Sequence, residues 1–222
     1  MDASYGYGMA KTRARRGTLV GQVMGLLAFS LLFTAGGAVL GRALGPGAII
    51  LSIVGSIGCL IGLFFARSKP GLNVGLFYAF SVFEGMALGL IIESYVARGM
   101  GGVVRNAAFT TGGLVMVLGG YAWTTKRDLS GLGGYLMAGL IGVIVAGLVG
   151  IFLQAPAFHL LLSAATAVLF SGFVLFDIQR LRYAEGTGQS DAVWLAISIY
   201  LDIFNLFLAI LRLFGFLSNS DD

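Results

Sequence analysis

Apolar residues run unbroken for about 20 positions at a time along most of this chain, and short polar segments separate the runs. A run of that length is what a helix needs to cross a bilayer. Membrane-spanning strands would instead show alternation between apolar and polar positions. Seven helical spans are therefore predicted, at residues 17–40, 47–66, 72–96, 105–123, 132–153, 157–181 and 192–217.

These spans divide the chain into a basic N-terminal tail at 1–16, a transmembrane domain at 17–217 and a short tail at 218–222. The composition agrees, because 58% of the 222 residues are hydrophobic and only 11% are charged. Soluble domains carry about 25% charged residues. We expect an all-α integral membrane protein, and its main interaction partner is expected to be the lipid bilayer.

Basic residues set the expected orientation. Of the 14 Lys and Arg residues, ten lie in segments on the N-terminal side of the membrane and four on the opposite side. The N-terminus is therefore predicted to be cytoplasmic, and the basic balance indicates topology rather than a nucleic-acid partner. The C-terminal tail is outside if the last segment crosses, and inside if it dips in and returns.

Small residues recur at the four-residue spacing that lets helices approach closely. The interpretation favoured here is close packing within one bundle, with a dimer face as the alternative. The pairs are Gly21/Gly25, Gly58/Gly62, Gly71/Gly75 and Gly85/Gly89.

Two aspartates interrupt the last two spans, and a carboxylate inside a span is costly enough to suggest function. Asp202 lies about 15 Å into the last span, with no basic residue within one turn. Asp177 has Arg180 three positions later, so an ordinary helix ion pair is the alternative for this residue. We expect the two acids to form one site.

The last span also carries a polar face at helical spacing, formed by Ser198, Asp202, Asn205, Ala209 and Arg212. Such a stripe is predicted to face the protein interior or a water-filled cavity.

The third span adds two acids. Glu84 lies near its middle, where it is either part of the site or a protonated packing residue. Glu93 lies near the outer end, at a depth similar to that of Arg212, and a structural clasp between them is expected. His159, at an outer helix end, is interpreted as an interfacial polar residue.

The small number of catalytic and metal-binding residue types argues against an enzyme. One His and one Cys cannot supply a zinc site, and Cys59 alone forms no internal disulfide. An intramembrane aspartyl protease also uses two aspartates, but such proteases typically show G-x-G-D and Pro-Ala-Leu motifs, which Asp177 and Asp202 lack.

The end of the chain resembles the Bax inhibitor-1 family, the transmembrane Bax inhibitor motif proteins. The resemblance rests on S-G-F-V-L-F-D-I-Q-R-L at 171–181, Y-L-D-I-F-N-L-F-L-A-I-L-R at 200–212, Asp191 and F-E-G at 83–85. Short tails are similar to those of bacterial members. The resemblance implies a seven-helix bundle in the cell (inner) membrane with the last helix central, acting as a pH-sensitive calcium leak.

The resemblance also implies roles for individual residues. Asp177 and Asp202 match the family's proton-sharing aspartates near the cytoplasmic side, and Arg67 is the nearest match to an arginine that latches the sixth-helix aspartate. With the predicted boundaries, the two acids meet only if the helices tilt or the sixth helix runs past Leu181.

A shared proton would tie the two helices together, and its loss would make the acids repel unless Arg67 or a cation compensates. Carboxylates suit Ca²⁺, so Asp177 and Asp202 are expected to hold it transiently, with no other cofactor. The rival hypothesis is a non-transporting membrane regulator that binds a partner helix. An oligomer is possible under either hypothesis.

Overall fold

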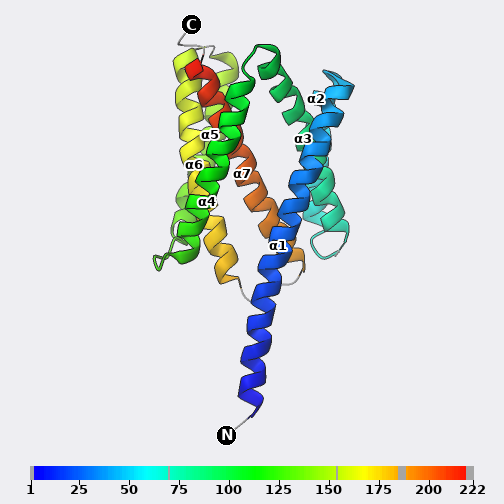
Figure 1. The fold of residues 1–222 in the computed structure, drawn as a ribbon, viewed down its shortest axis with the longest axis vertical. Coiled ribbons are helices and arrows are strands. Elements are labelled where there is room, and N and C mark those ends of the chain that lie inside the picture. Colours follow the sequence, from blue (N-terminus) through cyan, green and yellow to red (C-terminus); the bar gives the residue numbers. More distant parts are fainter. Residues whose placement is uncertain (1–2, 70, 154, 185–188, 219–222) are drawn as a thin grey trace. The chain divides into compact units, whose positions relative to one another are not determined.

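A computed structural model describes residues 3–69, 71–153, 155–184 and 189–218, and it describes side chains from residue 19 and, in the last range, from residue 192. Over these ranges the chain forms seven helices and no strand (Figure 1). All seven contain a stretch long and apolar enough to cross a membrane, so the fold is an all-α, seven-span membrane bundle. The helices are α1 Ala3–Leu44, α2 Gly47–Phe65, α3 Leu72–Ala97, α4 Gly101–Thr124, α5 Leu132–Phe152, α6 Pro156–Tyr183 and α7 Gln189–Ser218.

The predicted spans agree with the observed ones to within four residues at every boundary. The first apolar span covers Leu19–Leu44, whereas α1 itself begins at Ala3. The described part of the predicted N-terminal tail therefore continues α1 as one helix. Most of the predicted C-terminal tail at 218–222 lies outside the described residues.

The chain divides into two compact parts. The first comprises Met1–Ser94 and Tyr183–Ser198, and the second comprises Tyr95–Arg182 and Ile199–Asp222. Helix α7 contributes to both. In its most apolar window, 61% of the residues are buried, against 33% or fewer in each of the other helices. That burial is what a central last helix requires.

In the first part, α1 and α3 touch through their backbones. A side chain at any of four glycines would overlap the main chain of the facing helix, so only hydrogen fits at these positions. The predicted packing role of Gly85 and Gly89 is confirmed, whereas their counterparts on α1 were not predicted. The four contacts are Gly37 with Val82, Gly41 with Met86, Gly85 with Thr34 and Gly89 with Ala38.

The other predicted glycine pairs differ. A Cβ added at Gly21, Gly25 or Gly58 would have no heavy atom within 4 Å, and one at Gly62 would meet only the side chain of Leu76, at 3.3 Å. Backbone-to-backbone packing at glycines in this part is thus found between α1 and α3, whereas Gly55 of α2 makes room for the Phe83 ring of α3.

Helix α1 ends at a glycine–proline turn. Gly45 adopts φ +67°, and its N–H donates to the carbonyl of Gly41 at 3.0 Å. A glycine in this conformation followed by Pro46 is a common helix stop, because the proline cannot continue the helix.

We predict that Gly85→Ala destabilises the protein by about 1–3 kcal/mol, because the added methyl group forces α1 and α3 apart. Gly21→Ala is the matched control, since its methyl group meets open space and alanine favours the helix. Melting temperatures in detergent measure both. Equal melting temperatures for the two variants would show that the glycine contacts carry no packing constraint.

Candidate functional site

Helix α6 brings Asp177 to a buried position near its C-terminal end. The helix reaches Tyr183, two residues beyond the predicted end, so Asp177 lies about 9 Å from the terminus. Its neighbours Val174, Ile178 and Leu181 are buried, and Asp177 itself is only 5% exposed. Because α7 also begins earlier than predicted, at Gln189, the difference in depth between Asp177 and Asp202 along their helices remains about 10 Å, so the two acids meet through the tilt of the helices.

Helix α7 brings Asp202 against Asp177, and both residues belong to the second part. Asp202 is also 5% exposed, and the two carboxyl groups are in hydrogen-bonding contact. Ionised carboxylates only accept hydrogen bonds, so this contact needs a proton on one of them. Oδ2 of Asp202 finds no donor in the described structure. A hydrogen bond between these two carboxyl groups would therefore require one proton on the pair.

Arg180 provides a local charge for one member of the pair. Its Nη1 lies 3.8 Å from Oδ1 of Asp177, and its side chain is 58% exposed. The ion pair considered from the sequence is thus present. Exposed ion pairs contribute little to stability. This ion pair also does not account for the contact between Asp177 and Asp202.

The C-terminal end of α6 is held by the loop between α4 and α5. Gln179 donates from Nε2 to the carbonyl of Arg127 at 2.8 Å, and its Oε1 accepts from the N–H of Leu129 at 2.7 Å. Arg182 donates from Nη1 to the carbonyl of Thr125 at 2.9 Å. These bonds fix the turn of α6 that carries Asp177. They were not predicted, because their partners are about 50 residues away along the chain.

The same loop is ordered locally. The carboxylate of Asp128 accepts a hydrogen bond from the N–H of Ser130 at 2.9 Å, which holds the pKa of this exposed acid below its ordinary value.

The polar face of α7 is only partly turned inward. Ser198 and Asn205 are half-buried, and Asn205 donates to the carbonyl of Leu201 within its own helix at 2.8 Å. Arg212 is exposed. Residues of the opposite, aliphatic face are buried as well, namely Ile199, Leu206 and Ile210. Both faces of α7 are therefore buried, and burial does not distinguish the polar stripe from the aliphatic face. Within the polar stripe, Asp202 is the one ionisable residue that is buried.

Glu84, in the first part, is half-buried on α3. Its carboxyl group lies beside the Ser56 hydroxyl of α2, which itself donates to the carbonyl of Ile53 at 3.3 Å. The Ser81 hydroxyl, on the same helix, instead donates to the carbonyl of Phe77 at 2.9 Å. Glu84 thus links α3 to α2.

Glu93 forms an ion pair with Arg42 of α1, with Oε2 lying 3.9 Å from Nε, and both side chains are at least half exposed. From the sequence, Arg42 counts only as a topology signal. The predicted clasp between Glu93 and Arg212 stays a prediction, because the two residues belong to different parts of the structure.

Arg67 follows α2, and its guanidinium carbon lies 5.7 Å from the centre of the Trp194 ring. This cation–π contact lies within the first part and was not predicted, since Trp194 reads in the sequence as an interfacial anchor. The latch between Arg67 and Asp177 joins residues of different parts and stays a prediction.

Metal chemistry at the pair is restricted by the number of ligands. The described residues contain no cluster of three or more His, Cys, Asp and Glu side chains suited to a metal ion. Two carboxyl groups offer four oxygens, whereas Ca²⁺ takes six to eight. Water or backbone carbonyls would have to complete the shell of an ion at Asp177 and Asp202, which suits transient rather than lasting binding.

Comparison with known proteins agrees with this arrangement. Residues 16–219 match the family described as "Inhibitor of apoptosis-promoting Bax1". The chain belongs to the Bax inhibitor-1 family. The match covers all seven apolar spans up to Ser218 and both aspartates.

Members of the Bax inhibitor-1 family from different sources are similar to this chain. "Modulator of FtsH protease YccA" of Escherichia coli strain K12 is 34% identical over 196 residues, which is 87% of each chain. An uncharacterised membrane protein of Vibrio cholerae is 37% identical over 88% of each chain. A "Golgi anti-apoptotic protein" of vaccinia virus strain Lister is 33% identical over 76% of this chain and 68% of its own.

We predict that Gln179→Leu lowers stability by about 1–3 kcal/mol, because it leaves the N–H of Leu129 and the carbonyl of Arg127 without their partner. Hydrogen–deuterium exchange across residues 125–131 should rise with it. Lys126→Gln, an exposed change in the same loop, is the control. Unchanged exchange in Gln179→Leu would mean that the loop does not depend on α6.

Proposed function

We propose that this protein is a pH-sensitive calcium leak of the membrane, gated by the proton that Asp177 and Asp202 share. The observation that supports the proposal is the contact between two buried carboxyl groups on α6 and α7, which is complete only with a proton. Ionisable groups buried in a membrane-spanning bundle commonly mark ion or proton pathways.

In this mechanism the protonated pair holds α6 to α7. Loss of the proton leaves two negative charges in contact within a poorly hydrated site, and this arrangement is unfavourable unless a cation enters or the helices separate. Ca²⁺ and the proton compete for the same oxygens. The pair is thus a two-state element whose balance depends on pH and on Ca²⁺.

Other residues take supporting roles in the proposal. Arg180 supplies a solvent-facing charge beside Asp177. Arg67 would latch ionised Asp177, and Ser198, Asn205 and Glu84 would supply polar groups along the ion's route. Ca²⁺ is the transported ion rather than a resident cofactor, and no enzymatic step is proposed. The proposed location is the bacterial inner membrane, with a cytoplasmic N-terminus.

We predict that Asp177→Asn and Asp202→Asn each abolish calcium flux in proteoliposomes or remove its dependence on pH. An amide retains the shape of the carboxyl group and can donate to the remaining acid, but it does not release a proton over the physiological range. The measurement is dye-reported Ca²⁺ flux across a series of pH values. Asp128→Asn, a change at an exposed loop carboxylate, is the matched control and should behave as the wild type. Wild-type-like, pH-sensitive flux in both pair variants would remove the mechanism.

A second candidate function is a non-transporting regulator, and one observation favours it. The E. coli relative, which matches 87% of this chain, is named a modulator of FtsH protease. On this alternative, the chain modulates FtsH by helix contacts within the membrane, and the carboxyl pair only stabilises the bundle.

The two candidates give different results in one experiment. FtsH protease reconstituted with this chain should degrade its substrates at an altered rate if the chain is a modulator. Asp202→Asn would then change stability or the protease rate and would produce no specific calcium phenotype. An unchanged protease rate together with pH-sensitive calcium flux would favour the leak.

A further inference from the structure

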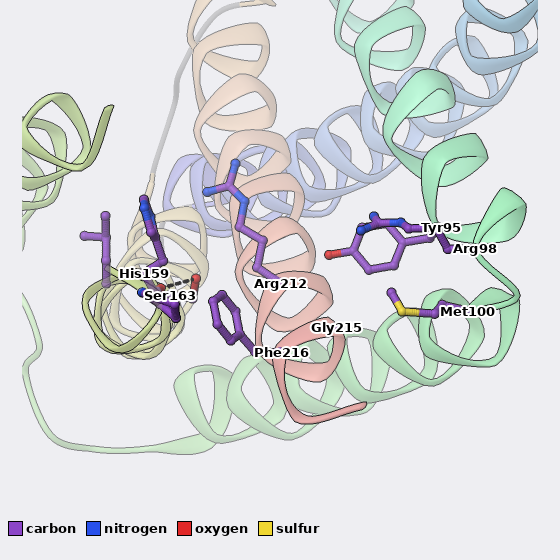
Figure 2. A pocket seen from close by; sticks show the side chains of 10 residues that line it. Tyr95, Arg98, Met100, His159, Ser163, Arg212, Gly215 and Phe216 are labelled. Carbon is purple, nitrogen blue, oxygen red and sulfur yellow. Dashed lines mark hydrogen bonds between the residues drawn. The ribbon is translucent and has the colours of Figure 1, made fainter. Parts of the chain in front are cut away.

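The second part contains a cavity of about 520 Å³ that the proposed function does not use. It lies where the C-terminal end of α3, the N-terminal end of α6 and the C-terminal end of α7 meet (Figure 2). Its volume is within the range of small-molecule sites, about 300–1,000 Å³. His159 at its wall lies 18 positions before Asp177 on α6, or about 27 Å along the helix. It is therefore separate from the carboxyl pair.

The polar groups that line the cavity are basic or neutral. Figure 2 shows His159 and Ser163 of α6 on one side, Tyr95 and Arg98 on the other, and Arg212 of α7 between them. The described lining includes no Asp or Glu. Two guanidinium groups beside an imidazole form a lining suited to an anion. The Ser163 hydroxyl already donates to the carbonyl of His159 at 2.8 Å, so the donors available to an anion come from the basic side chains.

The wall that carries Arg98 is fixed by the way α3 ends. Gly99 has φ +77°, its N–H donates to the carbonyl of Val96, and the N–H of Met100 donates to the carbonyl of Tyr95, both at 2.9 Å. This pair of bonds is a Schellman cap. It holds Arg98 with its guanidinium carbon 5.0 Å from the centre of the Tyr95 ring.

The same tyrosine joins this wall to α7. The Tyr95 hydroxyl donates to the carbonyl of Leu211 at 3.4 Å, and a Cβ at Gly215 would lie 2.7 Å from the Tyr95 ring. The absence of a side chain at Gly215 therefore makes room for the ring. Arg98 and Arg212 are brought to one cavity by a preformed scaffold, which limits the ordering cost of binding.

The depth of the cavity identifies the kind of anion. Arg98 directly follows the end of α3, His159 lies in the first turn of α6, and Arg212 lies about 9 Å before the end of α7. The basic groups thus lie within about 9 Å of the ends of their helices, and a membrane-spanning helix ends near the polar headgroups. Met100, Leu162 and Phe216 add apolar surface beside them.

We propose that this cavity binds a phosphate group, with Arg212 and Arg98 as its charged ligands and His159 beside them in the polar wall. An anionic phospholipid headgroup and a free phosphate share this chemistry. The apolar surface beside the arginines favours the phospholipid, whose acyl chain can lie against it.

The experiment compares the two sources on the full chain purified in detergent. Native mass spectrometry counts bound phosphatidylglycerol, with phosphatidylcholine as the uncharged comparison, and a thermal-shift titration with inorganic phosphate tests the soluble anion. The variants are Arg212→Gln and Arg105→Gln, the latter removing an exposed arginine of α4 that does not line the cavity. Melting temperatures without ligand confirm that both variants fold.

We expect Arg212→Gln to weaken phosphatidylglycerol binding by about tenfold or more, the effect of losing one charge-assisted contact, while Arg105→Gln binds as the wild type. Phosphatidylcholine should be retained far less than phosphatidylglycerol. Binding of inorganic phosphate with the same dependence on Arg212 would also support the site and would assign it to a soluble anion. Binding of neither probe, or equal losses in the two variants, would overturn the proposal.

Discussion

The burial of two carboxyl groups against each other is the constraint on which the second part of this protein depends. An isolated carboxylate in such a site would carry a large desolvation cost, and two in contact would add mutual repulsion. One proton removes half of the charge and supplies the only bond that two acceptors can make. On the proposed mechanism, Asp177 and Asp202 would therefore form a site that is more stable with one proton than without it.

The residues around the carboxyl pair hold α6 in place by several hydrogen bonds, whereas only the exposed Arg180 lies near enough to neutralise charge on Asp177. Gln179 and Arg182 bind the α4–α5 loop on either side of Arg180, so the last turns of α6 are held by hydrogen bonds to backbone carbonyls and an N–H. Asp202 lies in the middle of α7, which is continuous from Gln189 to Ser218 and contributes residues to both parts of the structure. A change in the protonation of the pair therefore acts on a helix that belongs to both parts.

The sequence predicted the spans well because a bilayer imposes both length and apolarity on each helix. It also predicted the carboxyl pair, because acids are so rare in such helices that each one is conspicuous. The contacts of Gln179, of Arg67 with Trp194 and of Glu93 with Arg42 were not predicted. They depend on which helix ends meet, and a one-dimensional pattern does not contain that information. Gly37 and Gly41 show the same limit, since 35 glycines offer many spacings and only packing selects among them.

The interpretation of Arg212 differs between the sequence and the structure. As part of a stripe with Asp202 and Asn205, it reads in the sequence as the outer end of a polar path and as a partner for Glu93. In the structure it lines a cavity with Arg98 and His159, and no acid lines that cavity within the described residues. Helices α6 and α7 thus carry acidic chemistry around Asp177 and Asp202 and basic chemistry near His159 and Arg212. Arg212 lies about 15 Å from Asp202 along α7, so the acidic and the basic site share this helix without sharing a residue.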